Sequence, residues 1–560
     1  MGPRTAIIIA VLALNLPFLF QPFHIDDRVY LEIADNALEN PWFPYDYAPL
    51  FEGILTPDAA SHSHLPLVSY YLASIKLVTG SEAEWVYHVA FLIFPILLAL
   101  SFFQITSRCI QRPLFAVFFL MLSPGVMLIG HSLMTEVPLL AFWTLAIARA
   151  WRLLDGVGKS RDWLFLGLAL VGAAMMTILS AGLVLLLAAM ALLWGPPREF
   201  SSDQRKRVLL LLAIPILVWL LWYFFGYLHY DRLLLVRTVQ HLDKRASFSL
   251  VLLGSKAVSF LLCLGGTIFF PLLPLIWFGR RILRWMGGLL GGAGATAQIL
   301  LNSWGIWEGL FFGFLLGVGS MVFAGTVWMF LERRREAVLG DRGRGARLLF
   351  LLWLLGILAA AILVYPSGSV RYVLLAFPPV IVAAFWSWER MRMYSANWVA
   401  TGLALTGLFS LSLSGADYAM ASMYKRQAND LVQQYQSEGH TVWFTAEWEF
   451  RYYLEKAGAK ILARTQLGPE VGDIVIKPYV AFPWRTLYDG KEFLRLKERR
   501  SAGAFPGIRL MDFSSRAGFY STAWGMLPYT ISNDPDWERF NVFEVIKVYD
   551  GPIPEPEKHY

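Results

Sequence analysis

The sequence predicts a polytopic α-helical membrane protein with about thirteen spans and a small C-terminal α/β domain. Of its 560 residues, 57% are hydrophobic and only 16% are charged, whereas soluble globular domains carry roughly 25% charged residues. Apolar runs long enough to cross a hydrocarbon core of about 30 Å recur over most of the chain. After about residue 416 these runs stop, and alternating strand and helix patterns begin.

The predicted domains are a membrane domain over 1–415 and a soluble domain over 416–560. We expect spans near 5–21, 84–105, 113–130, 137–150, 163–177, 180–194, 208–226, 256–279, 287–302, 308–331, 348–364, 372–388 and 398–415. The segment 163–194 could also form one long helix. The N-terminal segment resembles a signal peptide but has bulky residues where a small-residue cleavage site would lie, so we expect it to be retained as the first span.

Lysine and arginine are concentrated in alternate loops. These loops contain Arg108 and Arg112, then Arg149 to Arg161, Arg198 to Arg207, Arg280 to Arg284, Arg333 to Arg347, and Arg390 and Arg392. By the positive-inside rule the N-terminus is cytoplasmic, and thirteen spans then put the C-terminal domain outside a plasma (inner) membrane. The net charge of +7 lies mostly in these short clusters, so it does not indicate nucleic-acid binding.

This topology gathers several polar segments on the external face. They are the first loop (21–83), the second loop with Glu136, the loop before Arg371, and the C-terminal domain. The spans contain almost no carboxylates, although a transporter would keep functional charges there. The pattern therefore favours chemistry at the outer surface over a transporter or flippase of lipid-linked glycans. A ligase or polymerase of preassembled glycans would share this geometry and remains an alternative.

The first external loop opens with two adjacent acids, Asp26 and Asp27. One carboxylate could act as a general base that takes a proton from an acceptor hydroxyl. The second could tune the pKa of the first or bind an acceptor group. Alternatively, the two acids are simply solvated, or one caps the amphipathic helix pattern that follows.

Other polar candidates occur on the same face. His64 could contact a phosphate or a sugar hydroxyl, or be an ordinary interfacial residue. Glu136 could act together with Asp26 and Asp27. Alternatively, it is only a negative charge at a helix N-terminus, where the helix dipole favours an acid. Arg371 could bind a phosphate through two parallel hydrogen bonds, or extend toward lipid headgroups. Together they indicate a cleft for an anionic, lipid-linked substrate, and the neighbouring aromatic residues could stack on a sugar or lie in the membrane interface: Trp42, Phe43, Tyr45 and Tyr47.

These motifs resemble the C-type glycosyltransferases related to protein O-mannosyltransferases and lipid A aminoarabinose transferase (glycosyltransferase family 39-like). The matching residues are Asp26 and Asp27, Tyr30, 32–34, 64–67, Glu136 with Pro138, and 371–375 with Pro378 and Pro379. The chain departs from the family at Asp27, where the family usually has Glu, and at Leu65, where it has Pro. Thr177 is followed by Ile178 where many members have Lys, which removes one contact to the donor phosphate.

The resemblance implies transfer of a sugar from a polyprenyl-phosphate donor to a glycan, lipid or protein acceptor at the outer face. It implies Asp26 as the favoured base, with Asp27 and Glu136 as the other catalytic acids. Tyr30, His64, Arg371 and Tyr372 would bind substrate, with Arg371 on the donor phosphate. We expect single displacement with inversion, no cofactor and no catalytic metal.

Overall fold

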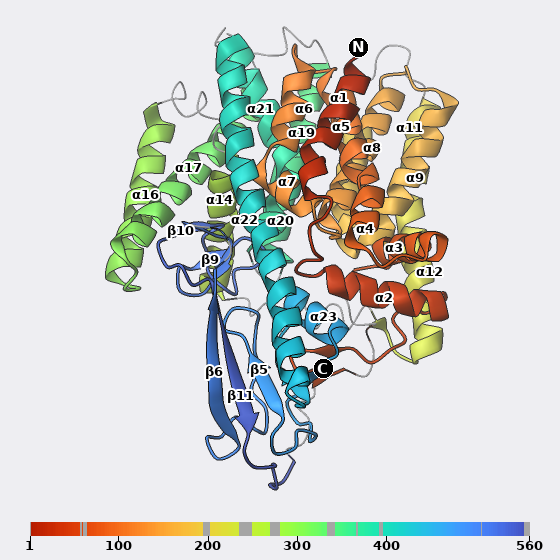
Figure 1. Cartoon of the computed structure of the whole chain (residues 1–560). Coiled ribbons are helices and arrows are strands. Elements are labelled where there is room, and N and C mark those ends of the chain that lie inside the picture. Colours follow the sequence, from red (N-terminus) through yellow and green to blue (C-terminus); the bar gives the residue numbers. More distant parts are fainter. Residues whose placement is uncertain are drawn as a thin grey trace.

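The structure, a computed structural model, is a bundle of long helices with a β-sheet region at one end (Figure 1). It describes residues 2–56, 59, 64–193, 202–234, 249–268, 281–332, 342–365, 368–390, 396–503, 505 and 507–553. The principal bundle helices are α1 (Pro3–Asn15), α4 (Glu84–Phe91), α5 (Ile93–Thr106), α6 (Pro113–Met121), α7 (Pro124–Gly130), α8 (Glu136–Leu154), α9 (Ser160–Met176), α10 (Ala181–Leu193), α11 (Ser202–Leu211), α12 (Ala213–Tyr230), α14 (Leu250–Thr267), α16 (Arg281–Leu300), α17 (Ile306–Leu331), α19 (Arg342–Leu363), α21 (Phe377–Arg390) and α22 (Ala396–Ser437).

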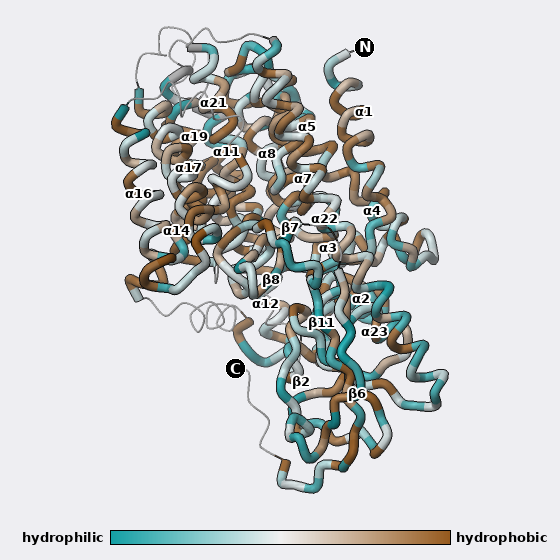
Figure 2. The backbone as a smooth tube through the Cα atoms, turned by 60° about the vertical axis from the view of Figure 1, so that its left-hand side comes forward, coloured by the Kyte–Doolittle hydropathy of each residue, from teal (hydrophilic) through white to brown (hydrophobic). Residues whose placement is uncertain are grey.

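Helices occupy all thirteen predicted spans, but the number that crosses the membrane is not established as thirteen. Among the described residues, eight helices are long and apolar enough to span, or nine if the bent pair α6 and α7 counts as one. Part of the predicted span 256–279 lies outside the described residues, since the description stops at 268. Figure 2 shows apolar residues along the bundle and hydrophilic ones around the sheet.

Two predicted spans are shaped by local breaks. The segment 113–130 bends by 57° between α6 and α7, because Pro124 begins α7 and forces extended backbone on Ser123. The segment 163–194 is two helices, since Thr177 is extended (φ −166°, ψ 148°) between α9 and a short 3₁₀ turn, η3 (Ile178–Ser180). The second break brings extended backbone toward the candidate site.

Glycines allow the helices α14, α16 and α17 to pack backbone against backbone. A Cβ atom on Gly291 or Gly313 would overlap a carbonyl oxygen of the facing helix, and one on Gly319 would overlap the Leu261 carbonyl on α14. Close approach of this kind holds membrane helices together where a hydrophobic driving force is absent. The glycine-rich segment 287–302 is therefore a helix with a packing role.

A five-stranded mixed sheet lies near the C-terminus. Its order is β4 (Lys460–Ile461), β3 (Val442–Phe444), β5 (Ile474–Lys477), β11 (Glu538–Val545) and β6 (Leu494–Ala502). The first three strands are parallel, and β11 runs antiparallel to both β5 and β6. Helix α23 (Trp448–Lys456) follows β3. Strands and a helix thus occur in the C-terminal region where the sequence shows alternating strand and helix patterns, although β11 ends at Val545 and the charge-rich β6 was not predicted.

Helix α22 joins the bundle to the sheet. It runs for 42 residues without a break through position 415, so the division between 1–415 and 416–560 falls inside one helix and stays a prediction. The first-loop helix α2 (Asp27–Glu39) lies at the same end of the bundle as the sheet (Figure 1). Helix α3 (Leu67–Thr79) packs against α2.

Candidate functional site

Three charged side chains from distant parts of the chain meet where the first loop contacts the bundle. Arg371 Nη1 lies 2.6 Å from Asp26 Oδ2, and Arg371 Nε lies 3.7 Å from Glu136 Oε1. Arg371 Nη2 donates to the Tyr372 hydroxyl at 3.0 Å. The side chains are 16%, 29% and 8% exposed for Arg371, Asp26 and Glu136. Asp26 is therefore the most accessible member of this charged cluster.

The backbone explains how each member reaches the cluster. Asp26 is the residue before α2 and follows Ile25, which has a left-handed backbone (φ 47°). Glu136 is the first residue of α8, where the helix dipole favours an acid. Arg371 lies in the one-turn helix α20 (Val370–Val373), which begins after extended Ser369.

Asp27 lies apart from the charged cluster. Its side chain is fully buried, and its two oxygens accept backbone N–H groups, Oδ2 from His24 at 2.8 Å and Oδ1 from Leu133 at 2.7 Å. Burial raises the pKa of Asp27 to about 7, although the two N–H donors oppose this shift. The carboxyl thus ties the first loop to the second, and its geometry favours a positioning role over the catalytic role expected from the sequence.

Tyr30 and His64 lie next to each other beside Glu136. Their ring centroids are 6.0 Å apart, and His64 Nδ1 is 3.4 Å from Thr135 Oγ1. Burial raises the pKa of Tyr30, and the charges of Glu136 and Asp26 raise it further. His64 also pairs as an isolated β-bridge with Thr177, the extended residue between α9 and η3. Thr177, which precedes the position where many family members have Lys, thus lies next to His64.

Tyr372 lies against the guanidinium of Arg371. The Arg371 Cζ is 5.0 Å from the centre of the Tyr372 ring, and that ring stacks on Tyr365 at 4.1 Å. Two stacked rings and a hydrogen bond hold the Arg371 side chain in one orientation.

Some hydrogen-bonding capacity around Arg371 is unused. Glu136 Oε2, Arg371 Nε and the Ser369 hydroxyl are buried and have no hydrogen-bond partner among the described residues. Buried polar groups normally have partners. A cation beside an accessible carboxylate can receive an anionic oxygen, and the carboxylate can accept a proton.

The aromatic residues of the first loop mostly pack against the bundle. Phe43 stacks on His229 at 3.6 Å, and Tyr45 is buried with its ring 6.0 Å from that of Trp222. Trp42 is 83% exposed. Phe43 and Tyr45 therefore pack against side chains of α12.

A buried polar network beneath Asp26 was not predicted from the sequence. His24 Nε2 lies 3.0 Å from Asp417 Oδ1, and His24 Nδ1 lies 3.3 Å from Glu449 Oε1. Tyr520 donates to Asp417 at 2.9 Å, and Glu449 accepts the Ile25 N–H at 3.0 Å. The network connects the first loop, α22 and the C-terminal region. Asp417, the first carboxylate of α22 after an apolar stretch, was the available signal.

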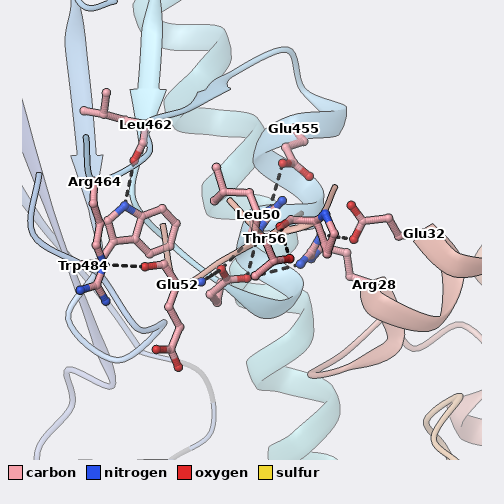
Figure 3. Close-up of polar contacts among 12 residues, drawn as sticks. Arg28, Glu32, Leu50, Glu52, Thr56, Glu455, Leu462, Arg464 and Trp484 are labelled. Carbon is pink, nitrogen blue, oxygen red and sulfur yellow. Dashed lines mark hydrogen bonds and ion pairs between the residues drawn. The ribbon is translucent and has the colours of Figure 1, made fainter. Parts of the chain in front are cut away.

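The first loop is also fastened to the C-terminal region by a hairpin of β1 (Leu50–Phe51) and β2 (Ile54–Leu55), as Figure 3 shows. Glu447 accepts the Glu52 N–H at 2.7 Å, and Arg464 donates to the Glu52 carbonyl at 2.8 Å. Gly53 has a φ of 77° and lies so close to the Trp484 indole that a Cβ would overlap it.

The opposite side of the site is held by a C-terminal segment. The Val370 N–H donates to the Phe519 carbonyl at 3.1 Å, and the Thr522 N–H donates to the Gly368 carbonyl at 3.1 Å. The loop that leads to Arg371 is therefore bonded to 519–522. The C-terminal region therefore bonds to residues that flank Asp26 (Ile25) and Arg371 (Gly368 and Val370).

Among the described residues, no group of three or more His, Cys, Asp or Glu side chains could hold a metal ion. The expectation of metal-independent chemistry stays a prediction.

Comparison with known proteins gives one sequence match. Residues 62–222 match the family described as dolichyl-phosphate-mannose-protein mannosyltransferase. This segment includes His64, Glu136 and Thr177. No match was found among curated proteins.

Solved structures give weaker likenesses. ArnT from Cupriavidus metallidurans bound to undecaprenyl phosphate is 12% identical, with 85% of this chain and 95% of that chain covered and a TM-score of 0.41. The oligosaccharyltransferase of Archaeoglobus fulgidus in complex with Zn and sulfate is 12% identical, with 82% and 62% covered and a TM-score of 0.48. The family match over 62–222 agrees with the resemblance of the loop motifs to the C-type glycosyltransferases.

Proposed function

We propose that this protein is an integral-membrane glycosyltransferase that moves a sugar from a polyprenyl-phosphate donor to an acceptor at the outer membrane face. The observation that carries this proposal is the cluster of Arg371, Asp26 and Glu136. It combines a cation for a phosphate with an accessible carboxylate for a proton. The family match over 62–222 supports the reaction class.

Donor binding would rearrange the cluster. The donor phosphate would take the place of Asp26 on Arg371, since a guanidinium binds a phosphate through two parallel N–H groups. Glu136 would remain beside the guanidinium and orient it. Asp26 would then be free to accept a hydrogen bond from the acceptor hydroxyl.

The chemical step would be a single displacement. The acceptor oxygen attacks the anomeric carbon, the bond from that carbon to the phosphate oxygen breaks, and Asp26 takes the hydroxyl proton. Arg371 stabilises the charge that builds on the leaving phosphate oxygen. Inversion at the anomeric carbon follows. With a phosphate or carboxylate acceptor, a base is less necessary and Asp26 would mainly orient the acceptor.

Neighbouring residues would shape this site. Tyr30 and His64 lie beside Glu136 and would contact the sugar or the phosphate; His64, next to Thr177, could serve where the family has a lysine. Tyr372 holds the Arg371 side chain. Asp27 would act as a positioning residue, because its carboxyl is fully engaged by backbone N–H groups.

The proposed orientation puts the N-terminus in the cytoplasm and the C-terminal region outside a plasma (inner) membrane. Lys491 is exposed, and the two native cysteines, Cys109 and Cys263, are buried. A Lys491→Cys variant should therefore react with an impermeant thiol reagent in right-side-out vesicles, with the wild type as the unlabelled control. Labelling only after permeabilisation would reverse the topology.

Purified protein should be tested with a panel of polyprenyl-phosphate sugars and candidate glycan, lipid and peptide acceptors. We expect release of polyprenyl phosphate that depends on one donor sugar and on Asp26. If no donor in the panel binds or turns over, the proposal fails.

A further inference from the structure

We propose that the C-terminal region carries a saccharide-binding platform for the acceptor, next to the charged cluster. This inference rests on the proposed glycosyltransferase function and assigns its acceptor a chemical class. The aromatic platform consists of Trp448, Tyr479, Phe482, Phe513 and Trp524.

The rings of the aromatic platform form one continuous group. The centroids of Trp448 and Trp524 are 4.4 Å apart, and Phe482 lies 5.7 Å from Trp448. Phe513 lies 5.8 Å from Trp524 and 6.0 Å from Tyr479. Trp524 is buried and Tyr479 is 49% exposed, while the other three are half-buried. The group thus passes from the packed interior to the surface.

Two members of the aromatic platform lie in loops at the carboxyl ends of neighbouring parallel strands. Trp448 follows β3 and Phe482 follows β5, and these two strands are parallel neighbours. Ligands of open α/β sheets bind outside the carboxyl ends of such strands. The two loops are bonded to each other, since Glu447 N–H donates to the Ala481 carbonyl at 3.1 Å.

Backbone strain marks two members of the aromatic platform. Trp448 has a φ of 57° and Phe482 has a φ of 47°. Bulky residues in the left-handed region are unusual, and such strain is concentrated at binding and active sites. A packed core could use aromatic residues without holding two of them in this conformation.

The loop that carries Tyr479 is fixed in advance. Buried Glu538 accepts the N–H groups of Tyr479, Val480 and Ala481 at 2.7–3.0 Å. Trp524 Nε1 donates to the Val480 carbonyl at 3.2 Å. A binding surface held rigidly in this way loses little conformational entropy when a ligand binds.

Two hydrogen bonds link segments that carry the aromatic platform to segments that carry the charged cluster. Glu449, next to Trp448, accepts the N–H of Ile25, and Ile25 precedes Asp26. Thr522, two residues before Trp524, bonds to Gly368, three residues before Arg371. A sugar ring stacked on the aromatic platform would lie on the side of the charged cluster that faces the C-terminal region.

The chemistry of the surface indicates the occupant. Aromatic faces bind the apolar face of a sugar ring, while Tyr479 adds an exposed hydroxyl for hydrogen bonding. Because the donor phosphate is assigned to Arg371 at the bundle, the ring on the platform would belong to the acceptor. The acceptor is therefore a glycan or glycolipid rather than a peptide.

The test uses the full-length protein in detergent and a panel of free hexose and N-acetylhexosamine tri- to hexasaccharides. Saturation-transfer NMR should detect binding of at least one saccharide to the wild type. Tyr479→Ala and Trp448→Leu should weaken its affinity by about five- to ten-fold, the loss expected for one aromatic contact. Tyr549→Ala, a half-buried tyrosine outside the aromatic platform, is the matched control.

Polyprenyl-phosphate binding, measured in the same variants, separates this inference from the proposed function. It should be unchanged in Tyr479→Ala and Trp448→Leu. The platform assignment is overturned if no saccharide in the panel binds, or if folded Tyr479→Ala binds saccharide like the wild type. Loss of the Arg371 dependence of polyprenyl-phosphate binding would instead overturn the proposed function.

Discussion

Asp26 and Arg371 are 345 positions apart in sequence and form an ion pair of 2.6 Å between Oδ2 and Nη1. The pair joins the first loop to the candidate span that begins at Val370. In this structure the proposed base therefore lies on the proposed phosphate-binding cation.

The variant Asp26→Asn should lose transfer activity and keep its fold. Removal of a general base typically lowers the rate by about 10²–10⁴-fold. Because the pair is partly exposed, its loss frees Arg371 at a small cost, and polyprenyl-phosphate affinity should rise by up to about five-fold. Asp35→Asn, on the helix α2 that follows Asp26 and in an exposed ion pair with Lys76, should change neither quantity. Normal turnover in Asp26→Asn would remove the base role.

The variant Asp27→Asn should lose stability as well as activity. An asparagine offers one acceptor oxygen, so either the His24 or the Leu133 N–H would face an amide NH₂ group. Leaving a buried donor without an acceptor costs about 1–3 kcal/mol. The melting temperature in detergent should fall clearly below that of Asp26→Asn. Equal melting temperatures for the two variants would contradict the positioning role.

Substitutions of Arg371 should weaken donor binding to different degrees. Arg371→Lys keeps the charge but loses the two parallel N–H groups, so it should bind polyprenyl phosphate more weakly yet retain some activity. Arg371→Ala should be much worse in both binding and rate. Arg485→Ala, at an exposed position of the C-terminal region, serves as the charge control. Unchanged donor affinity in Arg371→Ala would favour a lipid-headgroup role for this residue.

Gly53→Ala should loosen the first loop from the C-terminal region. A left-handed alanine costs about 1–2 kcal/mol wherever it occurs, and here its Cβ also meets the Trp484 indole. Gly80→Ala is the matched control, because Gly80 also has a positive φ (63°) and has open space around its Cβ position. Hydrogen exchange over 50–55 and 460–464 should increase in Gly53→Ala beyond any change in Gly80→Ala. Identical exchange in both variants would argue against a tight contact.

Stability should fall as the pH rises above neutral. Burial lowers the pKa of His24, but Asp417 and Glu449 outweigh it and hold the pKa well above 6.5. A base with a raised folded pKa contributes its full stability below the unfolded pKa, and loses it as the pH rises through the folded value. In His24→Gln the melting temperature should be lower at pH 6 and should approach that of the wild type at alkaline pH. A constant difference across the pH range would count against a charged His24.

Local features of the sequence were sufficient for the membrane class, the helix positions and the acidic loop. Apolar runs and Pro–Gly breaks act over a few residues, so they locate the bundle helices and α2 without knowledge of the fold. They also singled out Asp26, Glu136 and Arg371 as candidates on one face. For the segment 163–194, the sequence allowed either two helices with a break near Thr177 or one long helix.

Tertiary structure decided which of these candidates meet. Adjacent Asp26 and Asp27 look equivalent in sequence, yet one reaches Arg371 and the other is buried against backbone N–H groups of His24 and Leu133. The His24 network and the aromatic platform likewise join segments hundreds of residues apart. Such contacts depend on how helices and loops pack, and the periodicity of a single segment carries no information about its distant partners.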